Sequence, residues 1–320
     1  MHLVTGGAGL IGINLVDRLL SRGEIVIALD NLVRGRETYL RRFAGRPGFR
    51  FAQVDCADLA ALRRALAEVA APGQIREVWH LAANSDIPAG VAEPAVDHRN
   101  TFLTTFNTLI VMRELEIPVI RFSSSSSIYG EFGDRIIEED SGPLRPISNY
   151  GAMKLASEAQ ISAALESFLR RADIFRFPNV VGTPATHGVI YDFVAKLRRA
   201  GDRLDVLGDG SQCKPYMHVD ELVEAMLFIA DRANDRLNVF NIAPPDDGVT
   251  VRYIAETVRD IVAPAAEIRY GRGDRGWVGD VPKFRYSTAR LDRLGWRPKL
   301  TSADAVSRAA REIAAQRHGE

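Results

Sequence analysis

A glycine-rich turn near the start of the chain constrains the fold more than any other stretch. The apolar run 2–5 leads directly into Gly6-Gly7-Ala8-Gly9-Leu10-Ile11-Gly12, and an amphipathic pattern follows over 10–21. Glycines so placed close a tight turn, let a pyrophosphate approach the main chain and let a helix pack on the strand. A second apolar run, 24–29, ends on Asp30, where a carboxylate accepts hydrogen bonds from an adenosine ribose. These features predict a dinucleotide-binding turn rather than a glycine turn without a ligand.

Composition excludes several classes of protein. The chain has 320 residues, and its 41 Lys and Arg balance 41 Asp and Glu, so we expect neither a nucleic-acid partner nor a charged membrane surface. No apolar stretch approaches the roughly 20 residues that span a bilayer. With no leader before the first strand, we expect a cytoplasmic protein. Cys56 and Cys213 lack CxxC spacing and the six histidines lack paired spacing, so we predict no structural metal.

Apolar runs alternate with helical patterns through most of the chain. This alternation predicts an α/β fold with a doubly wound parallel sheet. The expected strands are 2–5, 24–30, 49–54, 77–81, 119–123, 173–177 and 238–242, and the expected helices are 10–21, 58–69, 100–115, 149–169 and 220–231. The stretch 34–47 is interpreted as a connection over the surface.

Prolines and glycines become frequent after Phe177, which indicates a second, smaller lobe. We expect residues 1–178 to form the nucleotide-binding domain, with a later segment of about 208–243 returning to it. Residues 179–207 and 244–320 would form a substrate-binding lobe. A cleft between two lobes suits a substrate that must be held against a cofactor.

The low-complexity run Ser123 to Ser127 lies between apolar residues on both sides. We interpret it as the end of a buried strand rather than as a flexible linker. The carboxyl ends of strands are where open α/β sheets hold ligands.

Tyr150 and Lys154 are spaced i and i+4, which places a phenol and an ammonium on one face of a helix. A tyrosine is ordinarily neutral, with a pKa near 10. Lys154 and a nicotinamide ring would both favour the phenolate and lower that pKa, which would make Tyr150 a general base. A serine at the end of the preceding strand would bond the same substrate oxygen.

Together these motifs resemble the extended short-chain dehydrogenase/reductase family, and within it the NAD-dependent nucleotide-sugar epimerases and dehydratases, especially UDP-glucose 4-epimerases. The resemblance rests on the glycine turn, Asp30-Asn31-Leu32, His80-Leu81-Ala82-Ala83, the serines before Ile128-Tyr129-Gly130, and Tyr150 with Lys154. It continues through Arg176-Phe177-Pro178-Asn179, Gly208-Asp209-Gly210, Tyr216-Met217-His218-Val219-Asp220 and Gly279-Asp280-Val281. It implies a Rossmann-like fold and NAD held tightly through the catalytic cycle.

The resemblance also assigns site residues by position. The catalytic residues would be Ser125, four residues before the tyrosine of the I-Y-G motif, with Tyr150 and Lys154. The residues that would contact NAD are Gly6, Gly9, Leu10, Ile11, Gly12, Asp30, Asn31, Asp55, Cys56, Leu81, Ala82, Ala83, Asn100, Tyr150, Lys154 and Pro178. An acid at position 30 disfavours a 2'-phosphate, so NAD is expected over NADP, and Arg34 and Arg36 are interpreted as a solvated surface loop.

The sugar chemistry follows from what stands beside Ser125. Family members that dehydrate or decarboxylate resemble one another in carrying an acid directly after the catalytic hydroxyl or two positions on, where this chain has Ser126 and Ser127. This difference favours 4-epimerisation of UDP-glucose and UDP-galactose. The implied substrate residues are Ser85, Ser125, Ser126, Tyr150, Asn179, Gly188, Val189, Val206, Lys214, Arg275 and Phe284. Lys214 and Leu207 depart from the usual arginine and aromatic residue, which leaves the nucleobase open.

Three alternatives remain at this point: a reductase, an epimerase of a uronic, GDP or dTDP sugar, and a non-catalytic NAD-binding protein. Tyr129, His80 and His218 are interpreted as packed structural residues. The helices predicted at 100–115 and 149–169 each carry a second apolar stripe. We therefore expect a homodimer joined through these two helices of each subunit.

Overall fold

The computed structural model describes residues 1–70, 74–273 and 285–316. The chain divides into two compact units. The first consists of residues 1–130, 143–176 and 226–240, and the second of residues 131–142, 177–225 and 241–320. Each unit has its own core and is described separately.

A seven-stranded sheet forms the centre of the first unit. Its order is β11-β6-β5-β4-β1-β2-β3, and the ladders that join β3 through β6 are parallel. The strands are β1 (His2–Thr5), β2 (Val26–Asp30), β3 (Phe49–Gln53), β4 (Glu77–His80), β5 (Val119–Ser123), β6 (Arg171–Arg176) and β11 (Leu237–Asn241). This arrangement confirms the predicted doubly wound parallel sheet. Because β2 and β4 lie on opposite sides of β1, the sheet has its topological switch point between β1 and β4.

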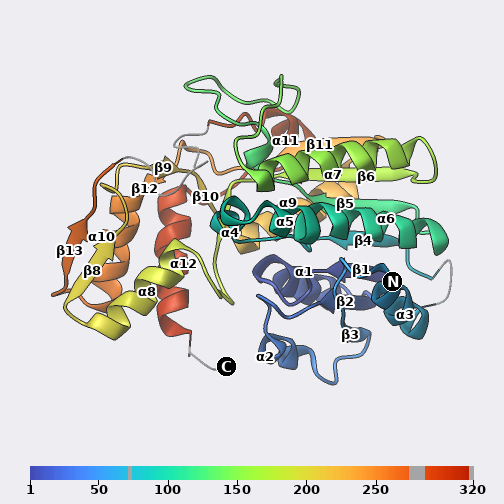
Figure 1. The fold of residues 1–320 in the computed structure, drawn as a ribbon, viewed down its shortest axis with the longest axis horizontal. Coiled ribbons are helices and arrows are strands. Elements are labelled where there is room, and N and C mark those ends of the chain that lie inside the picture. The colour runs from blue at the N-terminus through green and yellow to red at the C-terminus, as the bar shows by residue number, and fades with distance from the viewer. Residues whose placement is uncertain (71–73, 274–284, 317–320) are drawn as a thin grey trace. The chain divides into compact units, whose positions relative to one another are not determined.

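Three helices pack side by side on one face of this sheet: α3 (Leu59–Val69), α6 (Thr104–Glu114) and α7 (Asn149–Leu165) (Figure 1). They bury alternate strand residues such as Leu3, Val78 and Ile120. Strand side chains alternate between faces, so the intervening residues point to the opposite face, toward α1 (Leu10–Ser21).

The connections in this unit correct three expectations. The stretch 34–47 contains α2 (Glu37–Leu40) and the turn η1 (Arg41–Phe43), whose Tyr39 and Phe43 are buried, so it is more than a surface connection. The helix expected from Asn100 begins earlier, as a π-helical segment η2 (His98–Leu103) that leads into α6. Helix α7 ends at Leu165, because Glu166 already caps it. The short helices α4 (Ile87–Ala92) and α5 (Pro94–Asp97) precede η2.

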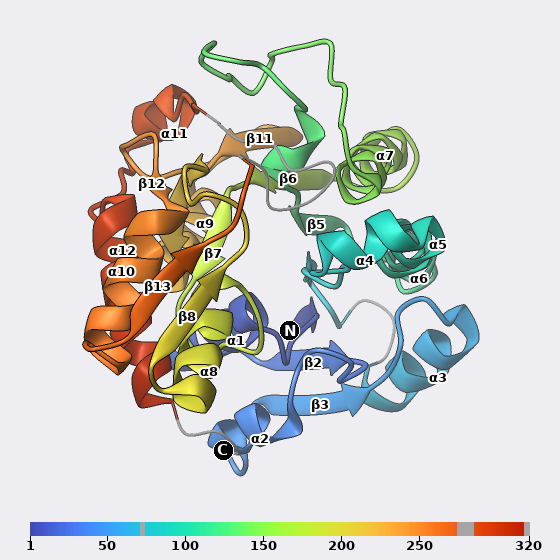
Figure 2. The same ribbon diagram turned by 60° about the vertical axis from the view of Figure 1, so that its left-hand side comes forward.

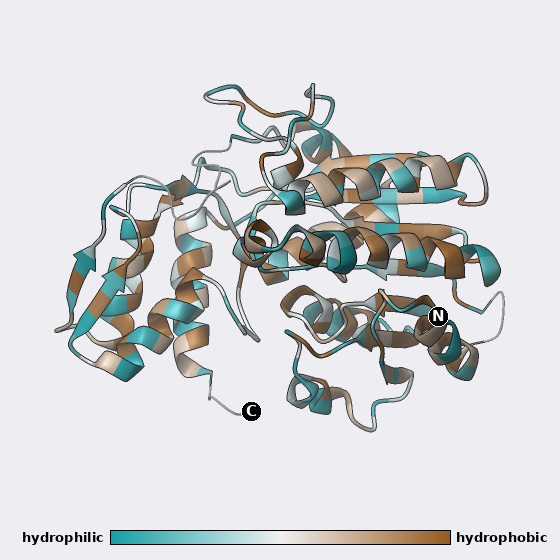
Figure 3. Ribbon diagram, viewed as in Figure 1, coloured by the Kyte–Doolittle hydropathy of each residue, from teal (hydrophilic) through white to brown (hydrophobic). Residues whose placement is uncertain are grey.

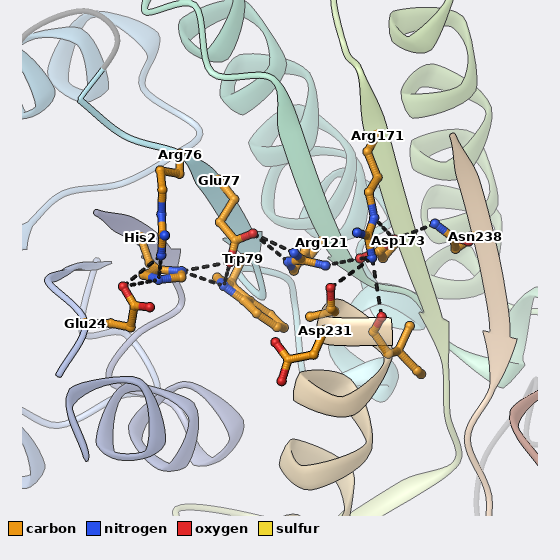
Figure 4. Close-up of polar contacts among 12 residues, drawn as sticks. His2, Glu24, Arg76, Glu77, Trp79, Arg121, Arg171, Asp173, Asp231 and Asn238 are labelled. Carbon is orange, nitrogen blue, oxygen red and sulfur yellow. Dashed lines mark hydrogen bonds and ion pairs between the residues drawn. The ribbon is translucent and has the colours of Figure 1, made fainter. Parts of the chain in front are cut away.

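Buried charges are linked at the amino-terminal ends of β1, β4, β5 and β6 (Figure 4). The Glu77 carboxylate contacts His2 Nδ1 at 2.7 Å and Arg121 Nε at 2.9 Å, and Arg121 also pairs with Asp173. Burial alone would raise the pKa of Glu77, but His2 and Arg121 outweigh it and lower this pKa to about 2. A cavity of about 310 Å³ lies beside this cluster, and Trp79 is among its lining residues.

The second unit packs three helices, α8 (Val189–Ala200), α10 (Val251–Val262) and α12 (Ser302–Ala315), around Val194, Val258 and Val306. Figure 2 shows β8 (Arg203–Val206) beside its parallel partner β13 (Glu267–Tyr270). Figure 3 shows apolar and polar residues alternating along α10 and α12, as expected of helices with one buried face. The shorter elements are β7 (Asn179–Val181), β9 (Cys213–Lys214), β10 (Tyr216–His218), β12 (Val249–Thr250) and α11 (Ala289–Leu294), while α9 (Val219–Arg232) runs through both units.

Within the described ranges, every helix falls short of the length and apolar content needed to cross a membrane.

Candidate active site

The glycine turn after β1 has the shape that a bound dinucleotide requires. A Cβ on Gly12 would lie 2.1 Å from the Gly6 carbonyl oxygen, so the helix can approach the turn only without a side chain. A Cβ on Gly9 would make only an ordinary van der Waals contact, 3.4 Å from the Gly6 carbonyl oxygen, so the protein does not crowd the main chain there. Gly9 also begins α1 without a side-chain acceptor. The amides at the start of α1 are therefore suited to a pyrophosphate, and the turn fits the predicted cofactor.

Asp30, at the end of β2, holds this turn in place. Its carboxylate accepts hydrogen bonds from the main-chain N–H of Ala8 at 3.0 Å and of Leu32 at 2.8 Å. Burial raises the pKa of Asp30, and these two bonds act against it. Leu32 has a φ of 61°, an uncommon conformation for a branched residue, and such strain is frequent at ligand sites. The Asn31 side-chain oxygen accepts a hydrogen bond from the Val33 N–H.

Thr5 and His80 join the ends of β1 and β4 beside the turn. The Thr5 hydroxyl oxygen accepts from the amides of Leu81 and Ala82, each at 3.2 Å, and lies 2.8 Å from His80 Nδ1. His80 Nε2 lies 3.1 Å from the hydroxyl of Thr105 on α6. Burial, with the charge of Lys154, lowers the pKa of His80 to about 3, so the ring is neutral. His80 is thus a packed residue, as predicted, that orders residues 81–83.

Three of the residues predicted to contact NAD lie just after β3, as Asp55 and Cys56 do, or in η2, as Asn100 does. Asp55 accepts from Arg99 at 2.6 Å, and Arg99 also donates to the Asn100 side chain at 3.1 Å. The Cys56 carbonyl accepts from Asn107 of α6 at 3.0 Å. Burial raises the pKa of the Cys56 thiol to about 12, so this thiol stays protonated. The Cys56 side chain is therefore a buried, uncharged group.

The serine run forms the buried end of β5, as predicted. Ser125 begins the short helix η3 (Ser126–Ile128), and its hydroxyl oxygen accepts from the Ser127 N–H at 3.1 Å. The same hydroxyl donates to Ser127 Oγ at 3.1 Å and is hydrogen-bonded to the Tyr150 phenol. A Cβ on Gly151 would lie 2.4 Å from the Ser127 carbonyl oxygen. Glycine at 151 therefore lets the first turn of α7 reach the serines.

Lys154 is buried one turn after Tyr150 on α7. Its Nζ donates to the Ser123 carbonyl at 2.5 Å and lies 4.7 Å from the centre of the Phe122 ring. Nζ is 5.8 Å from the centre of the Tyr150 ring. The structure thus brings together Ser125, Tyr150 and Lys154, the three residues that the sequence predicts to be catalytic.

The electrostatics of this group differ in one respect from expectation. Burial raises the pKa of Tyr150; among the described residues, the hydrogen-bonding interaction with Ser125 acts against this rise and the charge of Asp97 adds to it. Burial also lowers the pKa of Lys154 to about 7. The predicted lowering of the Tyr150 pKa by Lys154 is therefore not found, because the ammonium contacts a carbonyl and ring faces rather than the phenol oxygen.

The remaining predicted residues are divided between the units. Ser85, which is exposed, and Ser126, which is buried, belong to the first unit. In the second unit, Pro178 and Val206 are buried, Asn179 is exposed, and Lys214 lies on β9. There Gly188, with a φ of 101°, begins α8 just before Val189. Arg275, Phe284 and the motif 279–281 lie outside the described residues.

Two further pairs near the first-unit site were missed from the sequence. Arg34, expected to be solvated, forms an ion pair with Asp86, so residues that follow β2 and β4 meet beside the glycine turn. Glu158 pairs with Arg176 inside the unit. The sequence offered one signal that Glu158 belongs near the site: it follows Lys154 by four residues, which places both side chains on one face of the helix.

The model of the NAD dependent epimerase/dehydratase family matches residues 2–243. The chain belongs to that family. It is 28% identical over 313 residues to a putative UDP-glucose 4-epimerase of Methanocaldococcus jannaschii, with 96% of each chain covered. It resembles a UDP-galactose 4-epimerase crystal structure with a TM-score of 0.84 and 34% identity over 98% of each chain.

Enzymes with other chemistry are similarly close. A dTDP-glucose 4,6-dehydratase double mutant of Streptomyces venezuelae, crystallised with NAD, has a TM-score of 0.85 and 26% identity over 97% of this chain and 96% of that one. Membership of this family makes the chain an NAD-using enzyme of nucleotide-sugar chemistry. The resemblance to UDP-glucose 4-epimerases found in the motifs is confirmed.

Proposed function

We propose that this enzyme is a 4-epimerase that interconverts UDP-glucose and UDP-galactose. The observation that carries the proposal is the Ser125–Tyr150 hydrogen bond, with serines rather than carboxylic acids at positions 126 and 127. A dehydratase or decarboxylase would lack its proton donor there. Epimerisation needs only a base and a hydrogen-bond donor at one sugar oxygen.

In the proposed reaction the phenolate form of Tyr150, which the positive charge of a bound nicotinamide ring would favour against the effect of burial, accepts the proton of the sugar 4-hydroxyl. Ser125 donates a hydrogen bond to the tyrosine or substrate oxygen. A bound NAD, retained through the cycle, would supply the hydride acceptor for oxidation at C4 and the hydride for the reduction that follows. The sugar, oxidised to a ketone at C4, turns about its bond to the diphosphate, and Tyr150 returns the proton after reduction on the other face. Lys154, donating to the Ser123 carbonyl, is placed to hold a ribose hydroxyl.

The remaining assignments extend the proposal. The residues proposed to contact NAD are those assigned in the sequence analysis, and Ser85, Ser126, Asn179, Gly188, Val189, Val206, Lys214, Arg275 and Phe284 are proposed to contact substrate. A diphosphate suits the amide end of α8 at Gly188. We also propose a cytoplasmic enzyme, which suits its two free cysteines.

The first test incubates purified protein, without added cofactor, with UDP-galactose and separately with UDP-glucose. We expect interconversion, resolved by chromatography, with the mass of each sugar nucleotide unchanged. Loss of water or carbon dioxide from a nucleotide sugar would instead support a dehydratase or decarboxylase. If neither substrate reacts even with added NAD, the 4-epimerase assignment is wrong, and UDP-glucuronate and GDP and dTDP hexoses are then tested.

Tyr150→Phe tests the proposed base. We expect kcat to fall about 10³-fold, the range for loss of a general base, while NAD remains bound. Tyr253→Phe is the matched control, since it removes a phenol that is hydrogen-bonded to the Ser307 hydroxyl at 3.1 Å in the second unit. Nearly full activity of Tyr150→Phe would remove this residue from the mechanism.

We also propose a homodimer formed through α6 and α7. Phe106 of α6 is 38% exposed although it stacks on Phe102, and Ala159 and Ala163 of α7 are exposed as well. Large apolar and small residues on neighbouring helices suit close packing against a second copy. Sedimentation should give twice the chain mass at micromolar concentration, and Phe106→Asp should lower it. A mass of one chain for the unaltered protein would contradict the dimer.

A further inference from the structure

Glu158 lies at the centre of a buried cluster behind the proposed catalytic residues. It occupies α7 two turns after Tyr150 and is 6% exposed. Its carboxylate accepts two hydrogen bonds from Arg176, from Nε at 3.0 Å and from a terminal nitrogen at 2.6 Å. The Ser124 hydroxyl donates to the same carboxylate. Arg176 donates a further bond to the Tyr129 hydroxyl at 2.9 Å.

These bonds connect every segment that leads to Ser125. Ser124 precedes it at the end of β5, Tyr129 follows η3, and Arg176 is the last residue of β6. The Ser124 N–H also donates to the Phe175 carbonyl at 2.8 Å. Because Glu158 comes from α7, its carboxylate joins the strand end that carries Ser125 to the helix that carries Tyr150.

Glu158 also lies one helical turn after Lys154 on the same face of α7, and both side chains are buried. In the part of the chain that the structure describes, no carboxylate lies within ion-pair distance of the Lys154 ammonium, whose hydrogen bond goes to a carbonyl. Burial lowers the pKa of Lys154 to about 7, and the Glu158 carboxylate is the charge that raises it again. Loss of that carboxylate would remove this charge and would also leave the buried guanidinium of Arg176 without its ion-pair partner.

We propose that Glu158 is a positioning residue with two effects: its bond to Ser124 fixes the strand end that carries Ser125, and its negative charge maintains the ammonium form of Lys154. The second effect concerns the protein alone, whereas its consequence for turnover rests on the proposed function.

The protein arm of the test measures the titration of Lys154 directly. The chain has five lysines, so ¹³C-lysine labelling gives five side-chain signals, and Lys154→Arg identifies the relevant one. We expect the midpoint for Lys154 to fall by about one pH unit in Glu158→Gln, the size of a charge interaction across a partly polar interior. Ser124→Ala and Glu166→Gln, an exposed glutamate at the end of α7, should leave the midpoint unchanged.

Glu158→Gln leaves Arg176 unpaired in the interior and is expected to be less stable. The double variant Glu158→Gln with Arg176→Met removes both charges and tests the same loss of carboxylate in a neutral core. A midpoint that falls in the folded variant supports the electrostatic effect. An unchanged midpoint in a folded variant of either kind overturns it.

Activity measurements distinguish the effect of Glu158 on the position of Ser125 from the effect of its charge on Lys154. In Glu158→Gln the alkaline limb of the kcat profile should move to lower pH by the same amount as the Lys154 midpoint. In Ser124→Ala kcat should fall about 10-fold, with KM and the alkaline limb unchanged, because only the geometry of Ser125 is disturbed. Unchanged kcat in Ser124→Ala contradicts the positioning effect. A shifted Lys154 midpoint in a protein that converts no nucleotide sugar would reject the proposed function but not the electrostatic role.

Discussion

The two ends of the central sheet of the first unit bury titratable residues in opposite ways. At the amino-terminal end the charges pair with one another: Glu77 binds His2 and Arg121, while Asp173 binds Arg121 and Arg171 (Figure 4). At the carboxyl-terminal end, the Lys154 ammonium donates to a carbonyl and the Tyr150 phenol bonds a serine. Both groups there have a pKa displaced by burial toward the uncharged form.

This difference distinguishes a structural cluster from a reactive one. Ion pairs with complete hydrogen bonding keep their charges over the whole physiological range and only support the fold. A buried lysine whose charge is poorly compensated costs stability, and such costs are frequent where chemistry requires them. This contrast supports the proposal that the reaction takes place at the carboxyl-terminal end of the sheet.

Arg121→Met should produce the largest effect on stability. It leaves Glu77 and Asp173 without their shared guanidinium, and breaking a buried ion network costs about 3–5 kcal/mol. Chemical denaturation measures the loss. The kcat of the folded fraction should be unchanged, since the network lies at the far end of the strands. A stable variant with impaired turnover would reverse the roles assigned to the two ends.

Acid should weaken the same cluster through Glu77. Its pKa in the folded protein, about 2, lies below its ordinary value of 4.5. Unfolding therefore takes up a proton between these values, so the stability contributed by Glu77 is present above pH 4.5 and is lost as the pH falls toward 2. The loss amounts to about 3 kcal/mol. Denaturation of Glu77→Gln over the same pH range should show a smaller decline; an equal decline would assign the effect to other groups.

Lys154→Met should stabilise the protein while abolishing turnover. The pKa of Lys154 in the folded protein, about 7, lies below its ordinary value of 10.5. Below pH 7 the buried ammonium therefore lowers the free energy of unfolding. That cost disappears as the pH rises from 7 toward 10.5. We expect a gain of about 2 kcal/mol at pH 6, reduced because Phe122 and the Ser123 carbonyl partly solvate the ammonium. Thermal unfolding at pH 6 and pH 10 measures it, and a destabilised variant at pH 6 would contradict the comparison.

Arg34→Gln should produce the smallest effect. The Arg34 and Asp86 side chains are 44% and 34% exposed, and ion pairs of this kind contribute about 0–1 kcal/mol. Denaturation should therefore show a change of about 0.5 kcal/mol or less, close to that of the control Arg36→Gln in the same loop. A loss comparable to that of Arg121→Met would show that exposure does not distinguish the two ends.

The order of the elements and the residues of the proposed catalytic group could be predicted from the sequence. The turn Gly6 to Gly12 is compatible with few backbone conformations. The alternation of strand and helix patterns along the chain predicts a parallel sheet. Ser125, Tyr150 and Lys154 were predicted by position and lie together. Local patterns are sufficient for these predictions because each depends on the steric and hydrogen-bonding requirements of residues that are close in the sequence.

Only the tertiary structure decided which charges are compensated. Glu77, Arg121 and Asp173 are far apart in the chain and meet because three parallel strands align their amino-terminal ends. The same alignment places Lys154 against a carbonyl rather than a carboxylate. Electrostatic energies depend on distance and burial, which residue types and spacing do not specify, so the direction of the Tyr150 pKa shift required the fold.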